Sequence, residues 1–309
     1  MDDLSRGTLG TGICGRSWSI ADPLAQAYTR RRYARGHGAI VTTSREETVR
    51  SLSRDATEAG QRAIAVEAPV AVEFNGIGYA VMMMTPADLP AFALGFALTE
   101  RIAATPDDVI DIDVADVPAG IVLRVTVSPD AAKRIGERVR HRTSDTGCGL
   151  CGIASLESLE RPLPRRPKPM AIDRQAIFVA LEAMRAHQPL NRATGATHAA
   201  AWAGDDGTIA AAAEDVGRHN ALDKLIGMIG GSAPGPGFGL VTSRISFEMA
   251  DKALVARMPL LVGISAPTTM AVDHARGNGL GVVALARGDS MLVLHDPAGA
   301  ASEVIDTSS

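Results

Sequence analysis

Three short apolar runs in the second half of the chain constrain its fold more than any other feature. Residues 239–243, 260–265 and 280–286 have the length and aliphatic composition of buried strands. The stretches between them have helical periodicity, which predicts helices over 246–258 and 268–276. Strands that alternate with helices in this way favour a parallel sheet covered by helices. We therefore predict an α/β architecture for this half of the chain.

The first half has the pattern of a mixed α+β fold. Strand-length pieces over 63–72 and 79–84 flank the turn-forming pair Asn75-Gly76, which predicts a hairpin. A helix over 87–102 is expected next, with Pro86 at its first position and one apolar face. The same patterns predict strands over 110–114, 121–127 and 291–295, helices over 129–139, 173–187 and 214–229, and a hairpin of 197–203 with 207–213.

Composition divides the chain into four parts. Residues 1–40 lack sustained periodicity and are expected to be a disordered tail. Residues 41–145 form the smaller α+β domain, and residues 171–309 form the α/β domain. Between them, residues 146–170 hold a cysteine pair followed by a basic run with four prolines, which disrupt both helix and inner strand. We interpret this connecting part as a thiol-bearing arm.

Charge and cysteine usage exclude several classes of protein. The 309 residues carry a net charge of -4, so nothing indicates nucleic-acid binding. We find no secretory signal and no apolar run of about 18 residues, so we expect a cytoplasmic protein without a membrane segment. Three cysteines do not form a disulfide framework. In the cytoplasm a Cys-x-x-Cys pair is redox-active, metal-binding or catalytic more often than structural.

The candidate reactive groups are Cys148 and Cys151, which have glycines beside them. Glycine removes side-chain obstruction around a thiol, and the basic runs over 133–142 and 161–168, on either side of the cysteine pair, favour a lowered thiol pKa. The pattern alone leaves three functions open: a sulfur carrier that holds a persulfide, a dithiol redox pair, and part of a zinc site with histidine partners. Cys14 alone cannot complete a zinc site of four cysteines.

Polar residues follow each of the three predicted parallel strands. Ser243 and Arg244 follow the first strand, Ser265 follows the second, and Arg287 to Ser290 follow the third. The carboxyl ends of parallel strands share one edge of the sheet, and ligands bind there. Hydroxyls, arginines and the N–H groups of helix starts are the partners that phosphates prefer. The sequence therefore predicts a site for a nucleotide or a phosphorylated cofactor at this edge.

A second polar group lies near the predicted hairpin that precedes these strands. It comprises His198 and the run from Glu214 to Asn220, which includes Arg218 and His219. Two histidines, an arginine and acidic residues near a helix start indicate a site rather than isolated core residues. A Ser-His-Asp hydrolase is disfavoured, because the chain has no G-x-S-x-G motif.

Seven motifs, taken in order, resemble the formate dehydrogenase accessory sulfurtransferase family, FdhD, over about residues 64–296. They are Met82-Met-Met-Thr-Pro86, Ala93-Leu-Gly-Phe96 with Thr99-Glu100, Cys148-Gly-Leu-Cys151-Gly152, Thr197-His-Ala-Ala200, Glu214-Asp-Val-Gly-Arg-His-Asn220 with Leu222-Asp-Lys224, Thr242-Ser243 with Glu248-Met249, and Ser265-Ala-Pro-Thr-Thr269.

The resemblance implies a function. Proteins of this family take sulfur from a cysteine desulfurase as a persulfide and pass it to the molybdenum bis(molybdopterin guanine dinucleotide) cofactor, which formate dehydrogenase needs. By similarity, Cys148 bears the persulfide and Cys151 assists it. Two other functions stay open: a non-catalytic chaperone for the molybdenum cofactor, and a dithiol oxidoreductase.

The resemblance also implies a fold and a binding site. It implies a homodimer whose C-terminal domain is a cytidine-deaminase-like three-layer α/β sandwich. No metal is expected to be bound directly by side chains, and GDP is expected to act as a surrogate for the cofactor. The expected cofactor-binding residues are the family segment Leu285, Ala286, Arg287, Gly288, Asp289 and Ser290, together with His198, Arg218, His219, Ser243, Arg244 and Ser265.

A deaminase-like fold does not make the protein a deaminase. Zinc deaminases need H-x-E followed by P-C-x-x-C. In this chain the cysteine pair precedes His198 and His219, and neither histidine is followed by that glutamate. Deamination is therefore excluded.

Overall fold

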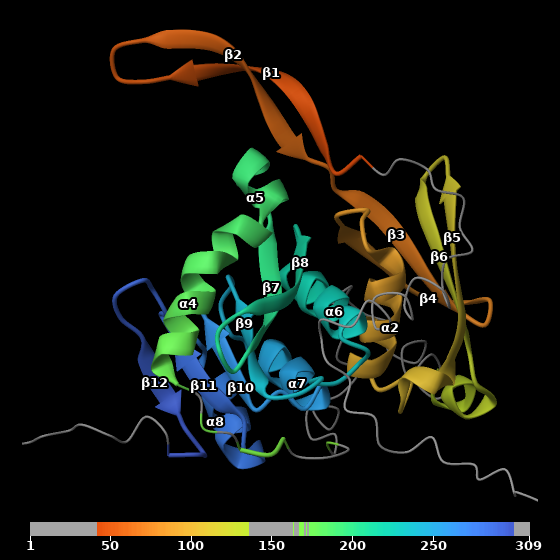
Figure 1. The fold of residues 1–309 in the computed structure, drawn as a ribbon. Coiled ribbons are helices and arrows are strands. Elements are labelled where there is room, and N and C mark those ends of the chain that lie inside the picture. The colour runs from red at the N-terminus through yellow and green to blue at the C-terminus, as the bar shows by residue number, and fades with distance from the viewer. Residues whose placement is uncertain (1–41, 136–162, 164–166, 170, 172, 300–309) are drawn as a thin grey trace, which may run out of the picture.

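The computed structural model describes residues 42–135, 163, 167–169, 171 and 173–299 (Figure 1). The predicted tail over 1–40 and most of the predicted arm over 146–170 lie outside these residues. The described strands form a two-stranded, a four-stranded and a six-stranded sheet.

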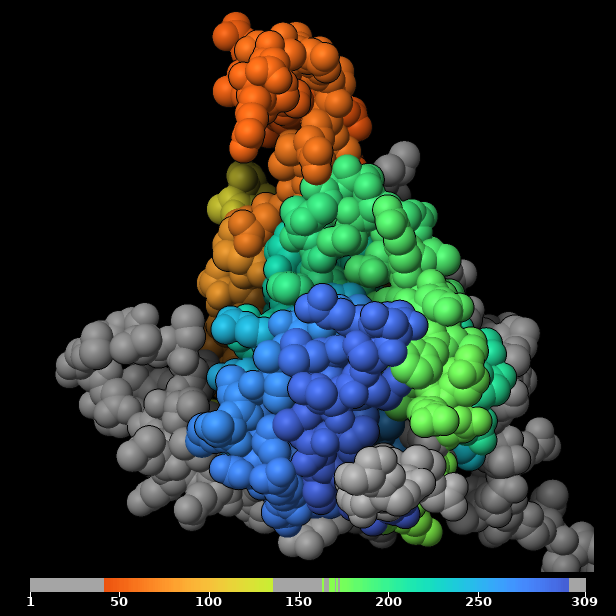
Figure 2. All heavy atoms as spheres, turned by 90° about the vertical axis from the view of Figure 1, so that its left-hand side faces the viewer, coloured from red at the N-terminus to blue at the C-terminus, as the bar shows by residue number. Residues whose placement is uncertain are grey.

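A two-stranded hairpin projects away from the rest of the molecule (Figures 1 and 2). It consists of β1 (Ser44–Leu52) and β2 (Thr57–Ala65), which are antiparallel and largely exposed on both faces. The prediction of one strand over 63–72 was wrong. Residues 63–65 pair with β1, whereas residues from 68 onward pair with a different sheet, so the strand is divided between the two.

The four-stranded sheet has the order β4-β3-β6-β5. The predicted hairpin is confirmed: β3 (Ala68–Phe74) and β4 (Ile77–Met84) are antiparallel and meet at Asn75 and Gly76, which have φ of 49° and 79°. Asn75 also accepts from Val127 N at 2.8 Å, so its side chain ties the turn to a neighbouring strand. The other two strands are β5 (Val109–Val117) and β6 (Gly120–Val127), which a short helix η1 (Pro106–Asp108) precedes.

Helix α2 (Leu89–Thr99) covers one face of this sheet and builds a core with it. The predicted start at Pro86 was wrong. Asp88 caps the helix with a φ of 54°, and the proline of the first turn is Pro90. The expectation of a single apolar face was also wrong, because nearly every residue of α2 is buried. The surface turned away from the sheet packs against α6 (Arg218–Met228).

The six-stranded sheet has the order β12-β11-β10-β9-β7-β8. Its three central strands are parallel, as predicted, and the outer strands run antiparallel to their neighbours. The strands are β7 (His198–Gly204), β8 (Ile209–Asp215), β9 (Gly237–Val241), β10 (Leu260–Gly263), β11 (Gly281–Ala284) and β12 (Leu292–His295).

Helices cover both faces of the six-stranded sheet. Helix α4 (Arg174–Met184) packs on one face, where alternate strand residues such as Ala201 and Leu240 meet it. Helices α6, α7 (Phe247–Val255) and α8 (Thr269–Asn278) pack on the opposite face. The helices and strands thus form three layers, and the predicted α/β class is confirmed. A short helix η3 (Arg185–His187) and helix α5 (Pro189–Thr194) connect α4 to β7.

One predicted helix start in this region needs correction. The helix expected over 214–229 begins only at Arg218, because Glu214 and Asp215 are the last residues of β8. Helix α8 ends at Asn278, two residues beyond its predicted end, and Gly279 follows it with a φ of 76°, a left-handed conformation that glycine adopts without strain.

Candidate functional site

The three parallel strands end at one edge of the sheet, and the loops that follow them are joined by backbone hydrogen bonds. Ile245 N donates to Ala266 O at 3.3 Å, and Thr268 N donates to Ile245 O at 3.0 Å. Leu285 N donates to Ser265 O at 3.3 Å, which connects the third loop to the second. The residues predicted after these strands therefore lie on one continuous edge.

Four basic side chains come together at this edge: His198, Arg218, His219 and Arg244. Strand β7 is antiparallel to β9, so His198 at its start lies beside the residues that follow the end of β9. Arg218 and His219 open α6 directly after β8. Burial lowers the pKa of His198, and the charges of Arg218, Arg244 and His219 lower it further. His198 is therefore neutral near pH 7 within a positively charged group.

Glu248 balances part of this charge. Its Oε2 lies 3.3 Å from His219 Nε2, although the two atoms are not aligned for a hydrogen bond. Ser246 Oγ donates to the same oxygen at 3.2 Å. The pKa of Glu248 is lowered to about 2. The contact with His219 is the largest cause, burial opposes it, and Ser246 and Arg218 lower the pKa further. The sequence alone indicated no role for Glu248. It appeared there only as part of the Glu248-Met249 motif of the family.

Some polar atoms of the basic cluster have no aligned hydrogen-bond partner among the described residues. Arg218 Nε is buried without a hydrogen-bond acceptor in the described part of the chain, and His219 Nε2 has only the unaligned contact with Glu248 at 3.3 Å. Gly217 is the N-cap residue of α6, and its lack of a side chain leaves the first N–H groups of the helix without a side-chain cap. Such donors suit phosphate oxygens. These residues therefore fit a phosphate-bearing cofactor.

Buried polar residues lie directly beneath the cluster. Lys224 Nζ lies 2.6 Å from Asp215 Oδ2, and both side chains are 0% exposed. Asn220 donates to Asp215 Oδ1 at 3.1 Å and to Met83 O at 3.0 Å. Glu214 points elsewhere and accepts from the N–H groups of Leu190 and Asn191 in α5. The acidic residues of this motif thus hold the fold together and do not face the basic cluster.

The predicted segment from Leu285 to Ser290 lies at the same edge, beyond β11. Leu285 has a φ of 48°, which a leucine rarely adopts. Ala286 is 1% exposed and packs into the core beneath α4, so only its backbone can face a ligand. Residues 287–290 are exposed and form a turn in which Arg287 N donates to Ser290 O at 2.8 Å. Ser243 is buried, and its hydroxyl donates to Arg244 O at 3.1 Å.

Cys148 and Cys151 lie outside the described residues, but the chain on either side of them is placed. Ile135, at the end of the helical residues 129–135, is 1% exposed in the core of the four-stranded sheet. Leu163 packs against the core of the six-stranded sheet. The described residues on the two sides of the cysteine pair therefore pack into different cores.

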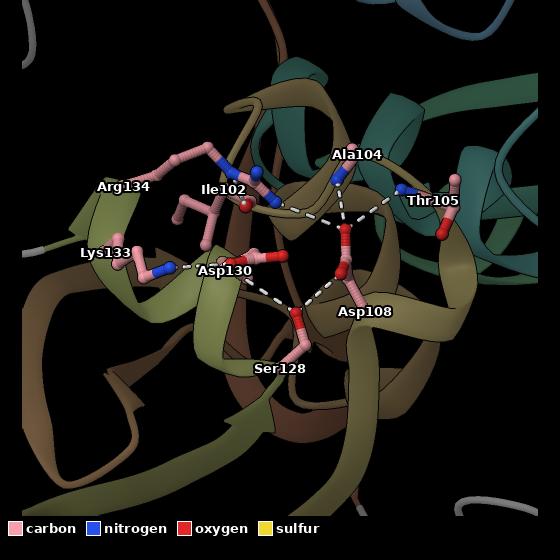
Figure 3. Close-up of polar contacts among 9 residues, drawn as sticks. Ile102, Ala104, Thr105, Asp108, Ser128, Asp130, Lys133 and Arg134 are labelled. Atoms are coloured by element: carbon pink, nitrogen blue, oxygen red, sulfur yellow. Dashed lines mark hydrogen bonds and ion pairs between the residues drawn. The ribbon is translucent and has the colours of Figure 1, made fainter.

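A polar network around Asp108 anchors the helical residues 129–135 (Figure 3). Asp108 Oδ1 accepts from Ser128 Oγ at 2.5 Å, and its Oδ2 lies 3.2 Å from Arg134 Nη2. Arg134 Nε also donates to Ile102 O at 2.7 Å. Burial raises the pKa of Asp108, but its hydrogen bonds with Ser128 and two backbone N–H groups, together with Arg134, lower it more. The carboxylate is thus ionised and holds Ser128 and Arg134, at the two ends of the described helical residues.

The described residues contain neither a candidate metal site nor a membrane-spanning helix. Among those residues, no group of three or more His, Cys, Asp and Glu side chains could hold a metal ion. In the same ranges, no helix is both long enough and apolar enough to cross a membrane.

Comparison with known proteins identifies relatives of this chain. Residues 65–300 match the FdhD/NarQ family. A protein of Variovorax paradoxus named sulfur carrier protein FdhD is 44% identical over 236 residues, which are 76% of this chain and 85% of the relative. The protein of the same name from Xanthomonas campestris is 44% identical over 239 residues, covering 77% and 85% of the two chains. One from Bordetella parapertussis is 42% identical over 236 residues, covering 76% and 86%.

A solved structure has the same fold. The crystal structure of a protein from Desulfotalea psychrophila, described as a formate dehydrogenase accessory protein, superimposes with a TM-score of 0.66. The superposition covers 83% of this chain and 98% of that one, at 20% sequence identity.

Proposed function

The chain belongs to the FdhD/NarQ family, and we propose that it is a sulfur carrier. It takes persulfide sulfur from a cysteine desulfurase and passes it to the molybdenum bis(molybdopterin guanine dinucleotide) cofactor, which formate dehydrogenase then uses. The observation that carries this proposal is the 44% identity, over 76% of the chain, to a protein named as a sulfur carrier. The homodimer and the cytoplasmic location stay predictions.

The basic cluster supports the choice of cofactor. The guanine dinucleotide form carries pyrophosphate groups, and phosphates prefer arginine side chains and the N–H groups of helix starts. Arg218 is the first residue of α6, and the charges of both Arg218 and Arg244 act on the neutral His198. When bound, the cofactor would supply the metal that receives sulfur, and Arg218, His219 and Arg244 would hold its phosphates at the sheet edge.

The loading step follows from thiol chemistry. The thiolate of Cys148 attacks the outer sulfur of the donor's cysteine persulfide. The bond between the two donor sulfurs breaks, the donor cysteine leaves as a thiolate, and Cys148 becomes a persulfide. One sulfur–sulfur bond forms and one breaks, so the step needs no outside oxidant or reductant.

The release step assigns a role to Cys151. Its thiolate attacks the inner sulfur of the Cys148 persulfide, the outer sulfur leaves as hydrosulfide, and a Cys148–Cys151 disulfide forms. The two thiol sulfurs supply the electron pair that converts the outer sulfur into sulfide. An external dithiol then reduces the disulfide and restores both thiols. Hydrosulfide would then be the form in which sulfur reaches the bound cofactor.

Chain length permits delivery to the sheet edge. Cys148 follows the buried Ile135 by 13 residues. A fully extended chain covers at most ~3.5 Å per residue, so the thiol can lie up to about 45 Å from this anchor. That span exceeds the diameter of a small domain, which is ~30 Å.

Sulfur loading tests the proposal directly. The purified protein is incubated with a cysteine desulfurase and labelled cysteine, and cyanide-releasable sulfur is then measured. We expect Cys148→Ala to abolish bound sulfur and formate dehydrogenase activation. Cys151→Ala should load sulfur but fail to activate the enzyme, and Cys14→Ala is the matched control that retains both. Full activation by Cys148→Ala would show that this assignment is wrong.

The same preparations separate the alternative functions. Stoichiometric zinc that is lost with Cys148→Ala, without any bound sulfur, indicates a chaperone whose cysteines bind metal. Catalytic turnover of a disulfide substrate without sulfur loading indicates a dithiol oxidoreductase.

Binding of GDP, as half of the dinucleotide, tests the cofactor site. We expect Arg218→Gln and Arg244→Gln each to raise the Kd for GDP by about tenfold, the loss of one charged contact. Arg45→Gln, on the projecting hairpin, is the control and should bind like the wild type. Equal affinity in all four proteins would place the nucleotide elsewhere.

A further inference from the structure

We propose that the buried Asp215–Lys224 pair positions Arg218 and His219 for phosphate binding. Asp215, Asn220 and Lys224 are then positioning residues that act through the two basic side chains. This inference rests on the proposed function, because it assumes that the basic cluster receives the phosphates of the cofactor.

The pair is fully buried and has few ways to move. Lys224 Nζ lies 2.6 Å from Asp215 Oδ2 and also donates to Thr85 O at 2.9 Å. Thr85 N donates to Asp215 Oδ2 at 3.1 Å. Replacing a buried ion pair with apolar residues of similar size is often neutral or stabilising. Stability alone therefore does not explain why this pair occupies the core beneath the cluster.

The second oxygen of Asp215 holds the turn that carries the two basic residues. Oδ1 accepts from Gly217 N at 2.7 Å and from Asn220 Nδ2 at 3.1 Å. Val216, which lies between Asp215 and Gly217, donates its backbone N–H to Thr85 Oγ1 at 3.2 Å. The residues before Arg218 and the residue after His219 thus all have fixed polar partners.

Close packing allows this turn little freedom. A Cβ atom added at Gly217 would lie 2.6 Å from Asn220 Nδ2 and 3.3 Å from Asp215 Oδ1. Asn220 Nδ2 in turn donates to Met83 O, at the end of the four-stranded sheet. The turn that carries Arg218 and His219 is therefore held between β8 and β4, one strand of each sheet.

The same helix provides a matched control. Asp223 and Lys252 form a second buried pair, with 2.8 Å between Asp223 Oδ2 and Lys252 Nζ. Both side chains are buried. Lys252 Nζ also donates to Thr99 Oγ1 at 2.9 Å. This pair connects α6 to α2 and α7. The turn before Arg218 is held by the carboxylate of Asp215 and not by Asp223. Loss of the second pair therefore removes a buried ion pair but leaves the turn before Arg218 in place.

The test replaces each pair with apolar residues. The first variant combines Asp215→Leu with Lys224→Met, and the control combines Asp223→Leu with Lys252→Met. Calorimetry measures the Kd for GDP and for inorganic pyrophosphate, well below the Tm of each variant. Sulfur loading of Cys148 by a desulfurase reports whether the rest of the protein is intact. Gly217→Ala, which adds one methyl group to the turn, supplies a second probe that changes no charge.

We expect the first variant and Gly217→Ala to raise both Kd values by about tenfold while sulfur loading is unchanged. The control should bind GDP within about twofold of the wild type. Adding Arg218→Gln to the first variant should cost much less affinity than Arg218→Gln costs in the wild type, because coupled residues do not act additively.

Three results would overturn the inference. If Arg218→Gln weakens binding but neither the first variant nor Gly217→Ala does, the positioning role is wrong and the proposed site stands. If the control weakens binding as much as the first variant, the effect is a general one of buried charges. If Arg218→Gln leaves GDP affinity unchanged, the cofactor site itself is wrong, and the inference fails with it.

Discussion

Gly95 in α2 packs directly against the backbone of Asp223 in α6. A Cβ atom added at Gly95 would lie 1.8 Å from the carbonyl oxygen of Asp223. The contact has a counterpart, because a Cβ atom at Gly227 would lie 1.9 Å from the carbonyl oxygen of Ala91. The two helices therefore approach more closely than any side chain permits, and this contact joins the four-stranded sheet to the layers of the six-stranded sheet.

Gly95→Ala is expected to lower the free energy of unfolding by about 3 kcal/mol, because the methyl group must push the two helices apart. Urea denaturation followed by circular dichroism measures the change. Gly78→Ala is the control, since a Cβ atom there meets nothing within 4 Å. Equal stability of the two variants would contradict the close helix contact.

Lys252→Met is expected to cost about 3–5 kcal/mol of stability, because it leaves the Asp223 carboxylate buried without its partner. Burial alone would lower the pKa of Lys252, but Asp223, Glu100 and Asp251 raise it above the usual value, so the lysine stays charged. Adding Asp223→Leu to Lys252→Met should restore most of the loss. A double variant as unstable as the single one would show that the cost does not come from the unpaired charge.

Asp108→Asn is expected to lower the free energy of unfolding at pH 7 by about 1 kcal/mol, as charged hydrogen bonds are weakened. The pKa of folded Asp108 lies below its usual value of 3.8. Its stabilisation is therefore present above pH 3.8 and is lost as the pH falls through the lower pKa of the folded protein. Denaturation at several pH values should show a constant difference between variant and wild type from pH 5 to 7.

The difference should shrink below pH 3.8, the usual pKa of the group. Asp55→Asn, on the exposed loop of the projecting hairpin, is the control and should match the wild type throughout. A gap that persists unchanged at low pH would mean that the ionised carboxylate is not the stabilising group.

Arg218→Gln and Arg244→Gln are each expected to raise the pKa of His198 towards its usual value of 6.5, because each removes a positive charge that opposes protonation. The remaining burial should keep the pKa below that value. Titration of the imidazole by NMR measures the shift. Arg287→Gln, in the exposed turn after β11, should leave the titration of His198 unchanged. A shift of the His198 pKa in this variant would show that Arg287 also belongs to the basic cluster.

Local sequence patterns predicted the elements whose structure is decided locally. Asn75-Gly76 forms the expected turn because both residues accept a positive φ, and Gly279 ends α8 for the same reason. The parallel central strands followed from their apolar runs, and this direction alone gathers Arg244 and Ser265 at one edge.

Long-range partners decided what the sequence could not show. Glu214 and Asp215 resemble first-turn residues of a helix, but α5 and Lys224 bind them and keep them on β8. Helix α2 shows no single apolar face because α6 covers the surface that would otherwise meet water. The carboxylate of Asp215 accepts from Thr85 N, which is 130 residues away in the chain, and no local pattern predicts that contact.

The projecting hairpin affects how the protein behaves when it is crowded. In the described part of the chain β1 and β2 pair only with each other, so each strand has an outer edge of free backbone groups. Such edges can template pairing between molecules. Charged side chains recur along both strands, among them Arg45, Glu47, Glu58 and Arg62. Charged side chains on an edge strand disfavour pairing with a strand of another molecule. These residues are therefore expected to reduce aggregation through the hairpin.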